Sequence, residues 1–251
     1  METAAPWLRV RAGAWHLHPL GRSEGQQGGQ AVITLHHAAQ SRSFRVLWFL
    51  HEAGLPFQLE RHRFGGKALR SPEFLALSPA GRVPALELEP GGRVMFESGA
   101  ILQYLSEARA PQLGRAQGDD ERAAYLEWMH YGETIAQHLA ALTFQHVVLD
   151  AGARSKALMK LEALRLGRVL DGLVPAFTDG RDWLLKGGFS AADIMVGGSL
   201  EIARRFRRLD EWPLLAAYHA RLVARPGFQA ARDDDGEAEL YLRDFYELPD
   251  E

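Results

Sequence analysis

The chain has 251 residues, of which 47% are hydrophobic and 24% charged, and a formal net charge of −3. This composition is ordinary for a globular protein, and the length allows one large domain or two modest ones. The small net charge gives no general attraction to nucleic acid or to an anionic membrane, and no run approaches the roughly 18 apolar residues of a membrane span. The chain has no cysteine, which excludes disulfide bonds, thiolate metal ligands and a cysteine nucleophile.

Residues 1–30 differ in composition from the rest of the chain. Arg9 and Arg11 interrupt the apolar residues, so a secretory signal is not expected. The segment ends in a run rich in glycine and glutamine, which is typical of flexible linkers. His16 and His18 lie close together, but no third metal ligand accompanies them. We interpret this segment as a flexible extension, with a targeting peptide as the alternative, and expect no metal site.

Residues 31–108 carry the alternating signals of a small α/β domain. Short β-branched or alternating runs predict strands, Gly54 predicts a helix end, and Pro90-Gly91-Gly92 predicts a hairpin turn. The predicted order is β-α-β-α-β-β-α. The strands are expected at 32–35, 57–60, 85–89 and 93–96, and the helices at 44–53, 71–77 and 98–108.

The second half of the chain predicts helices alone. Residues 109–118 are interpreted as a linker from their composition, and residues 119–251 as an all-helical domain. One apolar stripe with helical spacing consists of Leu166, Val169, Leu170 and Leu173.

A further helix, expected at Asp193–Arg208, has two informative ends. Ser190 and Asp193 stand where a serine and a carboxylate cap a helix start reciprocally. The basic run Arg204–Arg208 is interpreted as the solvated end of this helix, where cations complement the helix dipole. Neither end needs a catalytic role.

Four motifs follow one another along residues 31–230. They are Ser41–Trp48 with Glu52–Phe57, then Pro72–Leu86, then Glu97–Leu105, and finally Phe189–Asp193. In this order they resemble the cytosolic glutathione S-transferases of bacteria and fungi, in particular the serine-type members. Glu127–Tyr131 is similar to the start of the first long helix in a yeast-like subgroup. The resemblance implies an α/β thioredoxin-like N-terminal domain plus an all-α C-terminal domain, the glutathione transferase architecture.

The resemblance also implies an activity. A cytoplasmic homodimer is expected to conjugate its co-substrate, glutathione, to small hydrophobic electrophiles. Glutathione-dependent peroxide reduction, dehalogenation or isomerisation on the same site are alternatives, because variable helices build the electrophile pocket. A non-catalytic, transferase-like binding module is a further alternative. No nucleic-acid or membrane partner is expected.

Ser41 and Ser43 are the candidates for activating the thiol. A free thiol has a pKa of about 8.5, and lowering it by about two units takes about 2.7 kcal/mol. A hydrogen bond to a charged group supplies roughly 1.5–3 kcal/mol, and a helix N-terminus adds roughly 0.3–2 kcal/mol. Either serine also fits as a helix-capping residue. The resemblance implies Ser41, with Ser43 as the alternative.

Two short motifs are implied to bind glutathione. Val83 and Pro84 are similar to the family's cis-proline turn, whose valine main chain binds the cysteinyl part, and Arg82 precedes them as a candidate for the glycyl carboxylate. The Glu97 carboxylate is implied to pair with the γ-glutamyl ammonium, and Ser98 with the helix N-terminal amides to bind the α-carboxylate. The structural alternatives are a rigid turn and an N-cap at Ser98.

Other residues near these motifs have open roles. Tyrosine-type members carry their tyrosine where this chain has His36 and His37, and His37 either assists proton transfer or binds backbone or water. Arg42 and Arg45 either strengthen the positive field at the thiolate or pair with a carboxylate of the helical domain. The residues expected in the electrophile pocket, with core packing as the alternative, are Trp128, Tyr131, His138 and Phe144.

Overall fold

The computed structural model describes residues 32–248, and it contains a four-stranded sheet in the order β2-β1-β3-β4. Its strands are β1 (Ile33–His37), β2 (Phe57–Arg61), β3 (Ala85–Glu87) and β4 (Val94–Phe96). β1 is parallel to β2 and antiparallel to β3, and β3 and β4 form an antiparallel hairpin. The predicted β-α-β-α-β-β-α order is confirmed.

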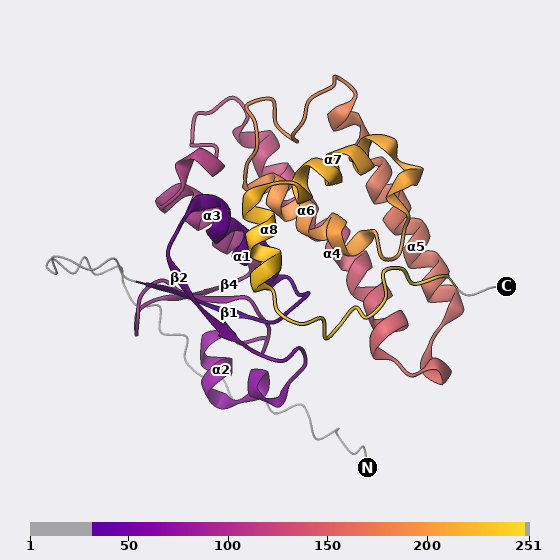
Figure 1. Cartoon of the computed structure of the whole chain (residues 1–251), viewed down its shortest axis with the longest axis horizontal. Helices are drawn as coiled ribbons and strands as arrows, with labels where there is room; N and C mark the ends of the chain where they lie inside the picture. The colour runs from indigo at the N-terminus through magenta and orange to yellow at the C-terminus, as the bar shows by residue number, and fades with distance from the viewer. Residues whose placement is uncertain (1–31, 249–251) are drawn as a thin grey trace, which may run out of the picture. The chain divides into compact units, whose positions relative to one another are not determined.

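Three helices cover the two faces of this sheet (Figure 1). α1 (Ser43–Ala53) and α3 (Ser98–Ala108) lie on one face, and α2 (Pro72–Leu77) lies on the other. α1 is rich in apolar residues, most of which are buried, and it ends where Gly54 takes a left-handed φ of 64°. Because α1 directly follows β1, its first residues lie at the end of the central strands.

Residues 109–248 contain helices, turns and loops but no strand, as predicted. α4 (Arg122–Thr143), α5 (Lys156–Asp171), α6 (Ala191–Ala203), α7 (Pro213–Val223) and α8 (Pro226–Asp234) follow one another. Three residues of the predicted stripe, Leu166, Leu170 and Leu173, are fully buried. Together with the sheet this gives the predicted fold class, an α/β thioredoxin-like domain followed by helices. The domain limits at 108 and 118 stay predictions.

α6 is the central helix of this part of the chain, and most of its residues are buried. Its start is the predicted reciprocal cap: Ser190 accepts from the Ala192 amide, and Asp193 accepts from the Ser190 amide. α6 has apolar residues on all sides, and such a helix is stable in a folded protein when every face packs against other parts of the protein.

The end of α6 corrects the sequence prediction. The helix stops at Ala203, not Arg208, because Phe206 turns into the core and stacks on Tyr246, whose amide donates to the Arg205 carbonyl. The basic run is therefore not a solvated helix end. It packs on the C-terminal segment (residues 235–248): Arg205 lies over the Tyr241 ring, and Arg208 lies over Phe245.

The sequence predicts neither a membrane span nor a metal site. Among residues 32–248, no helix has the length and apolar character needed to cross a bilayer. The same residues contain no cluster of three potential His, Cys, Asp or Glu ligands. His16 and His18 lie outside the described residues.

Candidate active site

The register of the sheet brings three separated motifs to one edge. His36 of β1 pairs with Ala85 of β3, which in turn pairs with Phe96 of β4. β1 and β4 therefore end where β3 begins. The loop to Ser41 follows β1, the Glu97–Ser98 pair follows β4 and the Val83–Pro84 turn leads into β3, so all three lie at this edge.

Ser41 and Ser43 lie together at the start of α1, but their environments differ. Their hydroxyl oxygens are 2.7 Å apart, and the Ser43 amide donates to Ser41 Oγ over 3.2 Å. Ser43 is fully buried, whereas Ser41 is 9% exposed and lines a cavity of about 250 Å³. Of the two hydroxyls, the Ser41 hydroxyl is thus the one that a ligand in this cavity can reach.

His37 continues the line of polar groups behind Ser43. Its Nδ1 lies 2.8 Å from Ser43 Oγ, and its Nε2 lies 3.0 Å from the Asp235 carbonyl and 3.3 Å from the Asp235 carboxylate. The imidazole is fully buried, so it does not reach the cavity itself. We call Ser41, Ser43, His37 and Asp235 the hydroxyl chain.

Arg45 links the start of α1 to three helices. Its guanidinium donates to Ser98 Oγ over 3.1 Å and to Ser199 Oγ over 2.7 Å, and it pairs with Glu133 of α4. Arg42 lies 3.5 Å from the same carboxylate. Burial raises the pKa of Glu133, but the two arginines outweigh it and hold that pKa below its ordinary value. Of the two alternatives for these arginines, pairing with a helical-domain carboxylate is confirmed.

Ser98 is not the N-cap of α3, the structural alternative considered for it. The N-cap position of α3 belongs to Glu97, and Ser98 is the first helical residue, so the interpretation of Ser98 as an N-cap is wrong. Ser98 is buried, with its oxygen accepting from Arg45, whereas the Glu97 side chain is exposed. The buried hydroxyl and the exposed carboxylate thus stand side by side at the α3 N-terminus.

The Val83–Pro84 peptide bond is cis, as the resemblance implied. Pro84 is buried and Val83 half-buried directly before β3, and the Arg82 side chain is exposed. The Arg82 carbonyl accepts from Ser78 Oγ over 2.7 Å. The Val83 backbone therefore lies at the same sheet edge as Ser41.

Two non-glycine residues with positive φ mark this region among residues 32–248. They are Gln40, with a φ of 57°, and Glu97, with a φ of 71°. Such conformations are uncommon outside glycine and cluster at functional sites, where the surroundings enforce them. The Gln40 side chain is fixed by the Leu240 and Tyr241 amides over 2.9 Å and 2.8 Å, and its own amide donates to Asp235.

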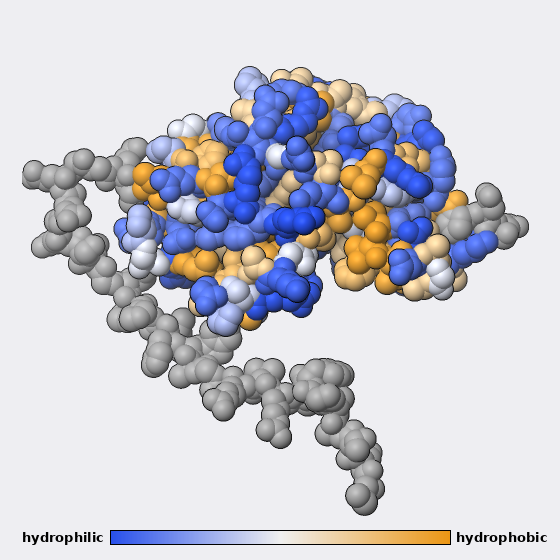
Figure 2. Space-filling view, turned by 60° about the horizontal axis from the view of Figure 1, so that its bottom comes forward, coloured by the Kyte–Doolittle hydropathy of each residue, from blue (hydrophilic) through white to orange (hydrophobic). Residues whose placement is uncertain are grey.

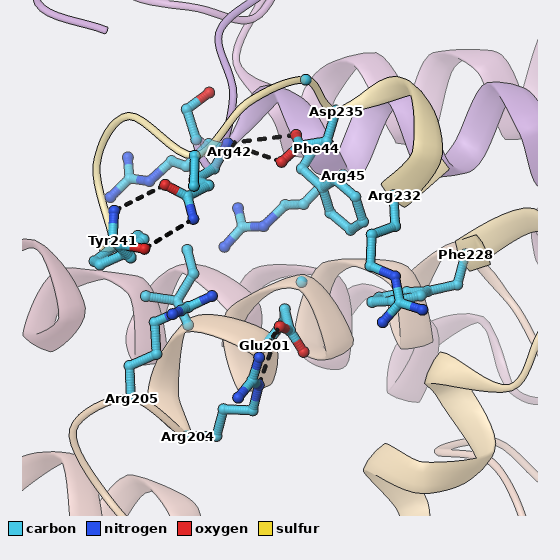
Figure 3. A pocket seen from close by; sticks show the side chains of 16 residues that line it. Arg42, Phe44, Arg45, Glu201, Arg204, Arg205, Phe228, Arg232, Asp235 and Tyr241 are labelled. Carbon is cyan, nitrogen blue, oxygen red and sulfur yellow. Dashed lines mark hydrogen bonds and ion pairs between the residues drawn. The ribbon is translucent and has the colours of Figure 1, made fainter. Parts of the chain in front are cut away.

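The cavity beside Ser41 lies between α1, the end of α6, α8 and the C-terminal segment (Figure 3). Apolar contact surface comes from Phe44, Ile202 and Phe228. The labelled arginines in Figure 3 come from three elements around the cavity: Arg42 and Arg45, Arg204 and Arg205, and Arg232.

The lining of the cavity contains more arginines than carboxylates, so its side chains carry a net positive charge. Burial raises the pKa of Glu201, but hydrogen bonds from His219 and Arg204 outweigh it and lower that pKa to about 2. Glu201 is therefore ionised and compensates Arg204. Arg205 and Arg232 form no salt bridge within residues 32–248; they bind the Arg243 carbonyl and the Gln229 side chain. The cavity combines apolar surface with unneutralised positive charge.

Comparison with known proteins identifies the family. Residues 41–108 match the model "Glutathione S-transferase, N-terminal domain". Glutathione S-transferase 3 of Zea mays is 32% identical over 196 residues, covering 74% of this chain and 86% of that protein. The chain belongs to the glutathione S-transferase family. A disulfide-bond oxidoreductase of Escherichia coli, YfcG, is 30% identical over 206 residues, covering 78% of this chain and 92% of the other.

A solved glutathione S-transferase supports the same assignment. The theta class enzyme of Xanthomonas axonopodis pv. citri, with glutathione bound, shares 30% identity and a TM-score of 0.70. The alignment covers 80% of this chain and 97% of that structure. Glutathione binding is thus a property of related structures, whereas the reaction differs among relatives.

The residues expected in the electrophile pocket do not line this cavity. Tyr131 donates to the Val169 carbonyl, and His138 binds Glu162, so both connect α4 to α5. These two residues, Trp128 and the exposed Phe144 are all absent from the lining of the cavity beside Ser41. Their contribution to an electrophile pocket stays a prediction.

Sequence reasoning also missed residues that do line the cavity. Gln40, Asp235 and Tyr241 meet there although about two hundred residues separate the first from the last. No motif marks the C-terminal segment as part of a site. Tyr241 is not directed at a ligand, since its hydroxyl binds Thr143 over 2.7 Å and burial raises its pKa to about 12.

Proposed function

We propose that this protein is a glutathione transferase in which Ser41 stabilises the glutathione thiolate. The observation that carries the proposal is the position of Ser41 Oγ, at the start of α1 and at the edge of the cavity. Ser43, the alternative residue, is fully buried behind it. A hydroxyl in this place can donate to a sulfur anion, and the positive end of the α1 dipole acts in the same direction.

Glutathione is proposed to bind along the sheet edge described above. The exposed Glu97 carboxylate pairs with its ammonium group, while Ser98 and the α3 N-terminal amides bind the α-carboxylate. The Val83 main chain, held by the Val83–Pro84 turn, binds the cysteinyl part, and the exposed Arg82 side chain contacts the glycyl carboxylate. Ser98 keeps a proton to donate because its oxygen already accepts from Arg45.

The cavity indicates a more specific electrophile than a purely hydrophobic one. Phe44, Ile202 and Phe228 offer apolar contact, and Arg205 and Arg232 offer guanidinium groups without a carboxylate partner among the described residues. Guanidinium groups bind carboxylates with directed, charge-assisted hydrogen bonds. The proposed second substrate is therefore a small electrophile with an apolar body and an acidic group.

This substrate class predicts a preference between two matched probes, the neutral 4-chloro-3,5-dinitrobenzamide and the anionic 4-chloro-3,5-dinitrobenzoate, which differ only in the acidic group. After division by the uncatalysed rates, kcat/KM is expected to favour the carboxylate roughly tenfold, the value of one charge-assisted hydrogen bond. Arg232→Gln is expected to remove most of this preference. Arg208→Gln, which removes an arginine from outside the cavity, serves as the control.

The two parts of the proposal fail separately in this assay. Equal use of both probes would contradict the acidic substrate class alone. Failure to conjugate glutathione to either probe, with glutathione bound, would contradict transferase activity and favour one of the other reactions of the family. Disulfide exchange on this site would depend on glutathione thiols alone, because the chain has no cysteine.

The proposal includes a homodimer, as is usual in the family. On α5, Leu158, Leu161 and Leu164 are exposed at intervals of three residues, which places them on neighbouring parts of one face. Figure 2 shows hydrophobic patches among hydrophilic residues on the face that it presents. Light scattering is expected to give twice the chain mass of 27.9 kDa. Leu161→Glu is expected to weaken the dimer and Leu75→Glu, on α2, to leave it intact; a monomeric wild type would contradict the proposal.

A further inference from the structure

When His37 is neutral, one arrangement of protons makes all the shorter contacts of the hydroxyl chain, and it leaves unused the longer contact of 3.2 Å from Ser43 Oγ to the Ala38 carbonyl. Both groups next to His37 Nε2, the Asp235 carbonyl and carboxylate, are acceptors, so Nε2 carries the hydrogen. Nδ1 is then an acceptor, and the Ser43 hydroxyl donates to it over 2.8 Å. Ser43 Oγ in turn accepts from the Ala38 amide over 3.2 Å and from the Ser41 hydroxyl over 2.7 Å.

This arrangement leaves Ser41 unable to stabilise a thiolate without a change. Its proton is directed inward to Ser43, and its oxygen, which already accepts from the Ser43 amide, keeps one lone pair for a ligand in the cavity. A thiol entering the cavity would therefore donate to Ser41, whereas a thiolate needs Ser41 to donate. Either the Ser41 hydroxyl rotates away from Ser43 toward the sulfur, or the order of protons in the hydroxyl chain reverses when the thiol ionises.

We propose that His37 is the acceptor of the thiol proton, reached through Ser41 and Ser43; this inference rests on the proposed function. The glutathione S–H bond breaks and its proton goes to Ser41 Oγ, the Ser41 proton moves to Ser43 Oγ, and the Ser43 proton moves to His37 Nδ1. One proton leaves sulfur and one arrives at the imidazole. Each serine ends with one hydroxyl proton, and Ser41 now donates to the thiolate.

The surroundings of His37 suit the imidazolium that this transfer creates. The Asp235 carboxylate faces Nε2 from the C-terminal segment and is itself held by the Gln40 amide over 3.1 Å. Other charged or titratable groups on adjoining elements include Glu60 and Arg61 in β2, His62 directly after β2, His36 on the same strand, Glu87 in β3 and Arg42 at the start of α1. Of these, Asp235 is the group in direct contact with the ring.

Counting protons tests the inference. Glutathione is mixed with the full-length enzyme in weak buffer at neutral pH, with thiolate followed by its ultraviolet absorbance and released protons by an indicator dye. S-methylglutathione, which has no thiol proton, gives the background. Wild type is expected to release far less than one proton for each thiolate formed, because the proton stays on His37. A release of one proton per thiolate in wild type would overturn the inference.

Two variants identify where the proton goes. In His37→Asn the side-chain oxygen can still accept from Ser43 but cannot take up a proton, so the release is expected to rise to one proton per thiolate. His36→Asn changes the neighbouring buried histidine, which binds His62 and Glu87, and is expected to behave as wild type. An unchanged ratio in His37→Asn would also overturn the inference. If wild type forms no thiolate at all, the proposed function fails instead.

Discussion

Replacing Ser41 by alanine is expected to lower kcat/KM for glutathione conjugation roughly 10- to 100-fold at neutral pH, the value of one hydrogen bond to an ionised sulfur. The loss is expected because the thiolate loses its hydroxyl donor, while the proposed contacts of Glu97, Ser98 and the Val83 main chain with glutathione remain. Glutathione affinity is therefore expected to change much less than the rate. Steady-state kinetics against glutathione concentration, from neutral to alkaline pH, measure both effects.

Two controls distinguish loss of the donor from general damage. Ser41→Thr keeps a hydroxyl and is expected to retain most of the activity. Ser106→Ala removes another buried serine, one that contacts Tyr125 and lies outside the cavity, and is expected to be silent in the rate. The deficit of Ser41→Ala should shrink at alkaline pH, where the thiol ionises without help. A Ser41→Ala enzyme with wild-type kcat/KM at neutral pH would rule Ser41 out.

Asp193→Ala is expected to lower the free energy of unfolding by about 3–5 kcal/mol, because it leaves several buried donors without an acceptor. Asp193 is fully buried and accepts from the Leu184 amide over 3.0 Å, the Ser190 amide over 2.9 Å and the Tyr218 hydroxyl over 2.8 Å. These contacts join the start of α6 to the preceding loop and to α7. Urea unfolding at neutral pH measures the loss.

Asp193→Asn is an intermediate variant, because its single amide oxygen can still accept some of the hydrogen bonds that the carboxylate accepts. Its loss is expected to be smaller than that of the alanine variant. Asp182→Ala, which removes an exposed carboxylate, is expected to change stability by less than about 1 kcal/mol. If Asp193→Ala cost no more than Asp182→Ala, the capping network would not stabilise the fold as described.

Patterns of neighbouring residues predict most of the strands and helices, because residues close in the sequence determine where these elements begin and end. Alternation located the strands, Gly54 ended α1 through its left-handed backbone, and the Pro90-Gly91-Gly92 turn closed the hairpin. The end of α6 was missed because a tertiary contact, Phe206 on Tyr246, outweighs the helix-forming tendency of the basic run. Such a contact between distant segments has no local signature.

The candidate site was predicted in part for the same reason. The resemblance implied that Ser41, Val83 and Glu97 bind the same glutathione, and the strand register brings all three to one sheet edge. The choice between Ser41 and Ser43 depends on which side chain is buried. The sequence does not show this, because both serines stand at the same helix start. Gln40 and Asp235 escaped prediction, because their contact joins residues 195 apart along the chain.

The pH titration of bound glutathione in the wild-type protein tests the central claim most directly. The ultraviolet absorbance of the thiolate is followed at saturating glutathione and compared with free glutathione. Thiolate stabilisation by Ser41 and the α1 N-terminus predicts a midpoint about two units below that of free glutathione. A midpoint equal to that of free glutathione, or no binding of glutathione, would contradict the proposed function.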